Sequence, residues 1–248
     1  MGWARRLSWI RHGRVAVVIA AALVALAFIV LSQPLWAFGV LGRVFPDMLF
    51  RVETDARVVG LSFDDGPDEV HTPRVLEILA RHGAHATFFM IGDRAVGRSD
   101  VVRTVREAGH EIGNHYFTIG SAVRAREDRF LGDVIRAEKA LSLGDVSPRL
   151  FRPPSGEFTQ AQLEMLKARG YRAVLGSVYP FDTSRPPVAY IRWLVSKNLA
   201  PGVIVILHDG VKDPTNMLTA LDEVLSEGAR RGFRFASVGE LMKLEAPK

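Results

Sequence analysis

Short apolar runs alternate with amphipathic stretches from about residue 55 to the end of the chain. Parallel strands joined by helices produce this pattern, because each strand is buried on both faces and each helix on one. Most intervals between the runs have helical spacing, so the class is α/β, and the number of runs suits a β/α barrel. The seven predicted strands are residues 58–63, 86–91, 110–113, 149–152, 171–177, 203–208 and 233–236.

Several residues at the edges of the predicted helices are typical of helix ends. Thr72 precedes Pro73 and is expected to be an N-cap before a proline in the first turn. Thr159 and Gln162 have the spacing of a capping box. A glycine closes three of the helices just before a strand, at Gly109, Gly170 and Gly232.

The N-terminal segment has a different pattern. Residues Val15 to Leu31 form a run of seventeen apolar residues, and no charged residue occurs between Arg14 and Arg43. A helix of this length can just cross a bilayer, and the preceding arginines favour a cytoplasmic N-terminus. We therefore expect a single-pass protein of the cell membrane with its folded domain on the extracytoplasmic side.

This reading divides the chain into a basic cytoplasmic N-terminus (1–14), a transmembrane signal anchor (15–32), a connector that lifts the domain off the membrane (33–54) and a folded domain (55–248). A cleaved signal peptide is the alternative. The apolar run is longer than a usual signal-peptide core, however, and Leu35-Trp36-Ala37 is a poor cleavage site.

Composition and charge narrow the classes of function. The chain has 248 residues, of which 48% are hydrophobic and 24% charged, as in a globular protein. There is no cysteine, which excludes disulfides and thiolate metal sites. Four arginines among the first fourteen residues account for most of the net charge of +5. The remainder offers no basic surface for a polyanion, so we expect no nucleic-acid partner.

Polar residues with catalytic chemistry follow four of the predicted strands. Asp64 and Asp65 end the first strand, where one carboxylate can bind a metal while the other acts as a general base; a simple turn is the alternative. His115 follows the third strand and is either a ligand or a structural histidine. Arg152 begins a rigid Pro-Pro-Ser-Gly loop after the fourth strand, and His208, at the tip of a buried strand, suits a general acid.

The segments FDDGP with Thr72, ATFFMIG, GHEIGNH, RPPSG and IVILHDG occur in an order and spacing that resemble the polysaccharide deacetylases, carbohydrate esterase family 4. The resemblance covers about residues 57–244. It implies a distorted (β/α)7 barrel that removes N-acetyl groups from amino sugars. It also implies a divalent metal, usually zinc, held by one aspartate and two histidines.

Roles for individual residues follow from matching positions in this resemblance. It implies Asp64 as general base oriented by Arg152, and His208 as general acid whose charge is held by Asp182. Asp65 and His115 would be metal ligands. The N–H of Ser155 would help to bind the oxyanion, and Ile206 would line the acetyl pocket.

The chain departs from the family pattern at the second metal histidine, whose place is taken by Ile119. A catalytic zinc normally has three protein ligands, and Thr118, His71 and Asp93 are the candidates to complete the set. Two family aromatic residues are also replaced, by Ser155 and Thr183, which weakens the surfaces on which a sugar would stack.

The leading hypothesis is a metal-dependent hydrolase that removes N-acetyl groups from amino sugars of a cell-wall or exported polysaccharide. A deacylase of an undecaprenyl-linked sugar is a second possibility, because a membrane anchor would keep the site near lipid headgroups. A catalytically impaired glycan-binding barrel that has lost its metal is the rival from another class, and Ile119 is the reason to consider it.

Overall fold

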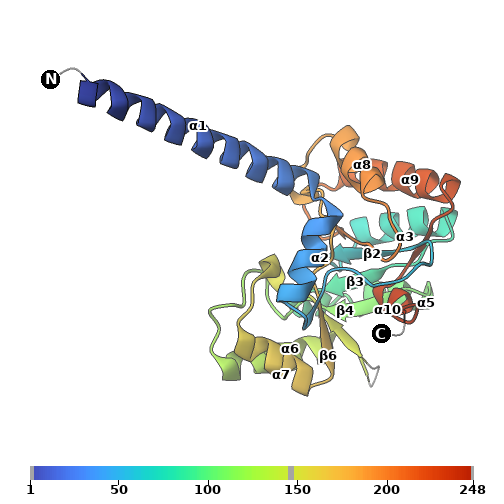
Figure 1. The fold of residues 1–248 in the computed structure, drawn as a ribbon. Helices are drawn as coiled ribbons and strands as arrows, with labels where there is room; N and C mark the ends of the chain where they lie inside the picture. Colours follow the sequence, from blue (N-terminus) through green and yellow to red (C-terminus); the bar gives the residue numbers. More distant parts are fainter. Residues whose placement is uncertain (1–2, 145–147, 247–248) are drawn as a thin grey trace. The chain divides into compact units, whose positions relative to one another are not determined.

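The computed structural model describes residues 3–144 and 148–246, and its body consists of parallel strands with helices packed on them (Figure 1). The chain divides into two compact units, Met1–Pro34 and Leu35–Lys248. The first contains helix α1 (Trp3–Ser32). The second contains, in chain order, α2 (Leu35–Val44), β1 (Met48–Leu49), β2 (Val58–Asp64), α3 (His71–Arg81), β3 (Thr87–Met90), α4 (Gly92–Ala95), α5 (Ser99–Glu107), β4 (Glu111–Asn114), α6 (Glu127–Ala140), β5 (Arg149–Phe151), α7 (Gln160–Ala168), β6 (Tyr171–Val174), α8 (Val188–Lys197), β7 (Ile204–His208), α9 (Thr215–Arg230), β8 (Arg234–Ala236) and α10 (Val238–Met242), with short 3₁₀ turns at Pro154–Gly156 and Asp182–Ser184.

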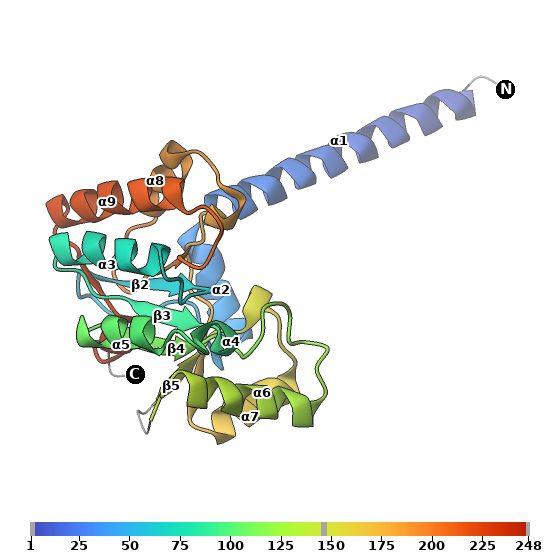
Figure 2. The same ribbon diagram turned by 180° about the vertical axis from the view of Figure 1, so that it is seen from behind.

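The described residues form one parallel sheet with the strand order β1-β6-β5-β4-β3-β2-β7, and β8 pairs with β2. All seven predicted strands are present. A bridge between Val178, which follows β6, and Val205 of β7 connects distant parts of this sheet. The sheet therefore curves toward a barrel, as the sequence predicted. The two opposite views show the helices packed around it (Figures 1 and 2).

Residues 35–54, which lie within the predicted connector, contain regular structure that belongs to the second compact unit. Helix α2 belongs to the folded domain, and Met48 and Leu49 pair with β6 as an additional strand, β1. Met48, Leu49, Phe50 and Val52 are buried. Burial of these apolar side chains stabilises the pairing of β1 with β6.

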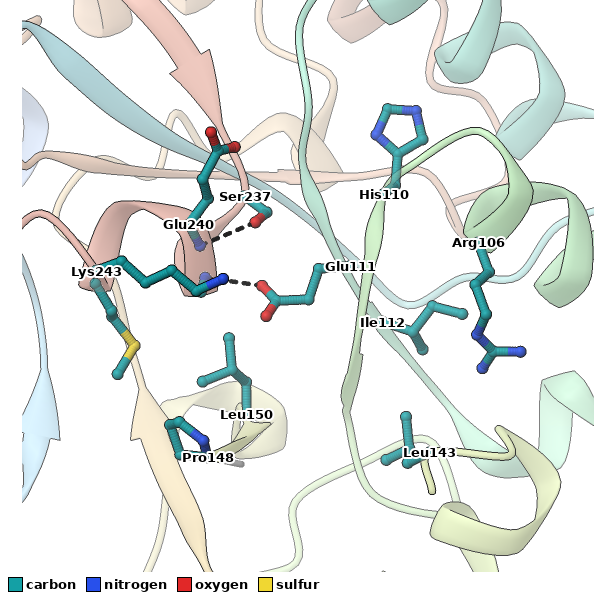
Figure 3. A pocket seen from close by; sticks show the side chains of 12 residues that line it. Arg106, His110, Glu111, Ile112, Leu143, Pro148, Leu150, Ser237, Glu240 and Lys243 are labelled. Carbon is teal, nitrogen blue, oxygen red and sulfur yellow. Dashed lines mark hydrogen bonds between the residues drawn. The ribbon is translucent and has the colours of Figure 1, made fainter. Parts of the chain in front are cut away.

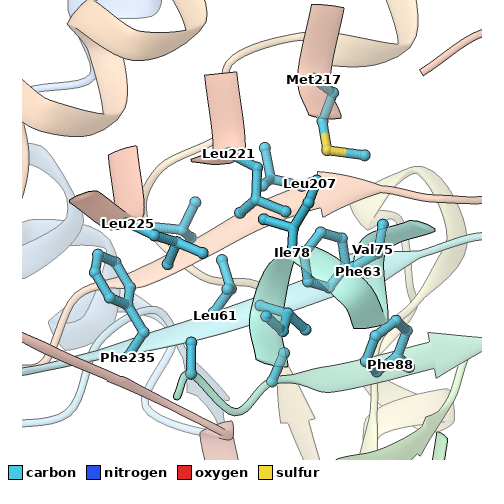
Figure 4. Close-up of a cluster of buried hydrophobic side chains, with 14 of the residues drawn as sticks. Leu61, Phe63, Val75, Ile78, Phe88, Leu207, Met217, Leu221, Leu225 and Phe235 are labelled. Atoms are coloured by element: carbon cyan, nitrogen blue, oxygen red, sulfur yellow. The ribbon is translucent and has the colours of Figure 1, made fainter. Parts of the chain in front are cut away.

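Strand β2 determines where the core ends and the site begins. Leu61 and Phe63 point into the main hydrophobic cluster beneath α3 and α9, and the Phe63 ring stacks on Phe88 with centroids 5.1 Å apart (Figure 4). Because side chains alternate along a strand, Ser62 and Asp64 face the other way, into the barrel. Asp64, the last residue of β2, therefore lies at the mouth of the barrel.

The helix ends agree with the sequence analysis except at Thr72. The capping box of Thr159 and Gln162 is formed in both directions, and Gly109, Gly170 and Gly232 have positive φ after their helices. Thr72, however, lies inside the first turn of α3. Its buried hydroxyl accepts a hydrogen bond from the Asp68 N–H and donates one to Asp209, because two buried polar groups must be satisfied there.

Within the described residues, no single helix has both the length and the apolar composition needed to cross a membrane. Val17–Ser32 and Leu35–Val44 meet that requirement only when they are taken together as a bent pair.

Candidate active site

The predicted site residues meet at the carboxyl ends of the strands, where β/α barrels hold their active sites. A cavity of about 410 Å³ opens there, which is within the usual size range of small-molecule sites. Asp182 lies behind the cavity wall, bonded to His208. The predicted residues that line the cavity are Asp64, Asp65, His115, Arg152, Ser155, Ile206 and His208.

Asp64 is held in place by Arg152 from inside the barrel. Arg152 Nη1 donates to Asp64 Oδ1 at 2.5 Å and to the Ser62 hydroxyl at 2.8 Å, and its Nε donates to the Val174 carbonyl at 3.2 Å. Asp64 and Arg152 are both buried. Burial lowers the pKa of Arg152, and the charge of Asp64 opposes that change. The carboxylate is thus fixed in one orientation, with its charge balanced.

His208 stands beside Asp64, because the two are paired residues in the register of β7 and β2. Asp182 holds this histidine twice, accepting from the backbone N–H at 2.8 Å and from Nδ1 at 3.0 Å. Burial works against the charged imidazole, but the hydrogen bond and charge of Asp182, with Asp64 and Asp65, outweigh it and raise the pKa of His208 to about 9. His208 is therefore a proton donor near neutral pH.

Asp65 and His115 form the part of the site that suits a cation. His115 Nδ1 lies 2.8 Å from the Arg152 carbonyl. A carbonyl oxygen can only accept, so Nδ1 carries the proton and Nε2 presents its lone pair. Nε2 lies 3.6 Å from Asp65 Oδ1, so the two groups could serve together as ligands of one divalent ion. Burial lowers the pKa of His115, which favours the neutral form that a metal requires.

A third protein ligand is not found in the described part of the chain, where no group of three or more His, Asp or Glu side chains could hold a metal. Ile119 lines the cavity and is 65% exposed. The three candidates to replace the missing histidine, Thr118, His71 and Asp93, are not among the residues that line the cavity. The donor set thus fits a metal bound by two residues.

The loop after β5 and the strand β7 shape the remaining walls. Ser155 has φ 58°, a left-handed backbone conformation, within the 3₁₀ turn Pro154–Gly156. Ile206 is half-buried and faces the cavity beside Leu175. Both predicted residues therefore line the cavity.

The sequence analysis missed two residues at this site. Tyr179 lines the cavity, and its ring lies 5.4 Å from that of His208, centroid to centroid. Arg94 of α4 donates from Nη1 to the backbone carbonyls of Asp65 and Gly210, so it ties together the loops that follow β2 and β7. An aromatic residue just beyond a strand was a usable signal for Tyr179. Nothing in the sequence marked Arg94.

A second cavity, of about 640 Å³, lies at the opposite ends of the strands (Figure 3). Glu111, at the start of β4, lines this cavity and is half-buried. Glu111 accepts hydrogen bonds from the Thr87 hydroxyl at 2.5 Å and the Gly239 N–H at 2.9 Å. The hydrogen bonds of this carboxylate are therefore made within the fold, which indicates a structural role. The smaller cavity, in contrast, is lined by several reactive groups that face one another.

Comparison with known proteins agrees with this geometry. A family model described as polysaccharide deacetylase matches residues 51–174. A peptidoglycan-N-acetylglucosamine deacetylase of Bacillus cereus is 37% identical over 196 residues, covering 78% of this chain and 92% of the relative.

Two solved structures show the same fold. The crystal structure of a peptidoglycan N-acetylglucosamine deacetylase superimposes with a TM-score of 0.75 at 28% identity, covering 81% of this chain and 95% of that one. A mutant of a CE4 family pseudoenzyme with restored enzymatic activity superimposes with a TM-score of 0.73 at 25% identity, covering 81% and 72%. The chain therefore belongs to the polysaccharide deacetylase family, carbohydrate esterase family 4, and is a carbohydrate deacetylase.

Proposed function

We propose that this protein hydrolyses the N-acetyl groups of amino sugars in a cell-wall or exported glycan. The observation that carries the proposal is the placement of Asp64 and His208 at paired positions of β2 and β7, each held by a buried partner of opposite charge and each facing one cavity. A base and an acid set apart in this way suit the two proton transfers of amide hydrolysis. The identity of the relatives as glycan deacetylases supports the substrate class.

The proposed reaction uses these groups in sequence. Asp64 accepts a proton from a water molecule as that water attacks the acetyl carbonyl carbon. The backbone N–H of Ser155 stabilises the negative charge that develops on the carbonyl oxygen. The protonated His208 then gives its proton to the sugar nitrogen as the C–N bond breaks. The products are a free amino sugar and acetic acid, which ionises to acetate. Asp64 then releases its proton to solvent and His208 takes one up, which the charge of Asp182 favours.

We further propose that Asp65 and His115 hold a divalent metal, zinc by family resemblance. The support is the separation of Asp65 Oδ1 from His115 Nε2 and the fixed tautomer of the imidazole. When bound, such an ion would polarise the acetyl carbonyl. With two protein ligands, the ion would be held weakly, and solvent would complete its coordination.

The test of function is acetate release by the purified protein in the presence of added zinc. Two substrates are compared in parallel, N-acetylglucosamine oligomers and intact peptidoglycan. Release from either glycan supports the proposal, and the ratio of the two rates identifies the substrate. The competing hypothesis is a glycan-binding barrel without catalysis. It predicts that the glycan is retained on the immobilised protein while no acetate appears. The full set of paired catalytic groups favours the hydrolase over this binder.

Replacing Asp182 with asparagine is expected to move the alkaline limb of the kcat–pH profile to lower pH. In the native protein His208 stays protonated up to about pH 9, so the rate should fall only above that value. Asparagine keeps an oxygen that can accept from Nδ1 but removes the negative charge, so the pKa should fall toward its ordinary value of 6.5. The measurement is kcat against pH with a soluble oligomer.

The control for this profile is Asp93→Asn, which changes an exposed aspartate outside the cavity and should leave the profile where it is. An unshifted Asp182→Asn profile would show that another group sets the alkaline limb. The raised pKa of His208 also makes the stability of the fold depend on pH. The stability that it contributes is fully present below about pH 6.5 and is lost as pH rises through about 9.

We also propose that the protein is a membrane protein whose domain faces away from the cytoplasm. The support is the apolar run of residues 15–31, which follows four arginines in the sequence. Fractionation of cells that express the full chain tests this: the protein should remain with membranes after a high-salt wash and should be cut by protease added outside the cell membrane.

A further inference from the structure

Helix α2 exposes a stripe of large apolar side chains. Trp36, Val40 and Val44 recur every four residues and are 65%, 49% and 61% exposed. Phe45, 43% exposed, follows the helix. Residues four apart lie on one face of a helix, so the three form a single row. Single exposed apolar residues are ordinary on a protein surface, but a contiguous row marks an interaction surface.

The other side of α2 is fixed to the catalytic domain. Phe38 and Leu41 pack against the cluster of Met48, Phe50, Leu163 and Ala173, and the Phe38 and Phe50 ring centroids are 6.3 Å apart. Leu175, which lines the catalytic cavity, packs against the same cluster. Figure 1 shows α2 lying against the body of strands. The exposed stripe is therefore presented by a helix that is part of the catalytic domain.

Charge around α2 is suited to an anionic surface. The first acidic residue of the whole chain is Asp47, and the charged residue of α2 is the exposed Arg43. Asp47 is itself paired with Lys167 at 3.2 Å, and Arg172 donates to the Asp47 carbonyl. A surface with apolar and basic side chains and little free acid is attracted to anionic lipid headgroups.

The position and size of the stripe indicate which surface covers it. Only residues 32–34 separate α2 from the apolar run that ends at Leu31, so the stripe continues a segment already proposed to enter a bilayer. A helix of ten residues is about 15 Å long. The three side chains of the stripe, together with Phe45, offer much less area than the roughly 800 Å² per partner of a stable protein interface.

We propose that α2 is an interfacial helix, whose exposed stripe lies among the headgroups and upper acyl chains of an anionic bilayer and seats the catalytic domain on the membrane surface. Tryptophan is favoured at this depth because its ring is apolar and its N–H is polar. The domain thus rests against the lipid instead of being held away from it by a flexible connector. This placement needs no assumption about the reaction, so its test is independent of deacetylase activity.

The absence of cysteine from the chain allows a single-label experiment on the full-length protein. Val40→Cys and Gly42→Cys, each carrying an environment-sensitive fluorophore, are compared in vesicles of phosphatidylglycerol and phosphatidylethanolamine with or without brominated acyl chains. In both variants the fluorophore is attached through a cysteine side chain, but the two positions lie on different sides of α2. A Cβ at Gly42 meets no atom within 4 Å, so the cysteine fits there. Bromines should quench the Val40 label at least about twofold more than the Gly42 label, because the helix is about 10 Å across.

Adding Val44→Glu to the Val40-labelled chain should bring its quenching down to the Gly42 level, because a carboxylate in the stripe disfavours insertion and Val44 is exposed enough to be changed without disturbing the fold. Equal quenching of the two labels would overturn the proposal. So would energy transfer between labelled copies without acyl-chain quenching, because it would show that a second copy of the chain covers the stripe.

Discussion

Asp64→Asn is expected to lower kcat for acetate release by about 10²–10⁴-fold, the usual contribution of a general acid or base. Asparagine has nearly the same shape, and its oxygen can still accept from Arg152 Nη1, so the barrel should remain folded. What is lost is the ability to take a proton from the attacking water. The measurement is steady-state acetate release at saturating oligomer, and KM should change little because the substitution removes a group that acts in the transition state.

The matched control is Asp93→Asn, the same chemical change at an exposed carboxylate after a neighbouring strand, which should retain full activity. Thermal unfolding of Asp93→Asn should resemble that of the native protein, whereas Asp64→Asn should unfold at a lower temperature, because the buried Arg152 loses its counter-charge. Activity of both variants is therefore compared well below their unfolding temperatures. If Asp64→Asn kept most of the native rate, the base would have to be sought elsewhere in the cavity. Asp65 would then be the next carboxylate to test.

Ile119→His is expected to increase zinc affinity by more than roughly 100-fold, because it supplies a third direct ligand beside Asp65 and His115. Residues that only support the ligands typically contribute roughly 10–100-fold. Ile119 already lines the cavity and is 65% exposed, so the substitution should cost little stability. The measurement is zinc affinity by competition with a chelator of known affinity, with bound metal confirmed by elemental analysis.

Two further variants make the metal experiment specific. Ile119→Gln, a polar side chain of similar reach without an imidazole, should leave zinc affinity near the native value. His115→Ala in the Ile119→His background should abolish the gain. An Ile119→His variant with native affinity would contradict the placement of the metal between Asp65 and His115.

Much of the fold was predictable because the strands have simple patterns. The run 203–207 is continuously apolar because β7 is buried on both faces. All seven predicted strands are present. The strand β1 within residues 33–54 was not predicted. It is only two residues long and is stabilised by pairing with β6, far along the chain. A contact of that kind leaves no local pattern.

The site shows the same division. Asp64, His115, Arg152 and His208 could be singled out because each follows a strand, and the strand ends of a barrel meet at one mouth. Thr72 was misassigned because its partner, Asp209, is 137 residues away. Arg94 was missed because it acts on backbone carbonyls, which any sequence possesses.

The sequence by itself determined the class of fold, the family and which polar residues stand at the strand ends, because these depend on periodicity and on motifs that are local in the chain. Only the tertiary structure decided how those residues act together: Arg152 on Asp64, Asp182 on His208, and His115 turned toward Asp65 by a backbone carbonyl. It also decided that α2 packs on the domain with an apolar stripe outward. The physical reason is that charge pairing and burial depend on distances in space, and the curvature of the sheet sets those distances.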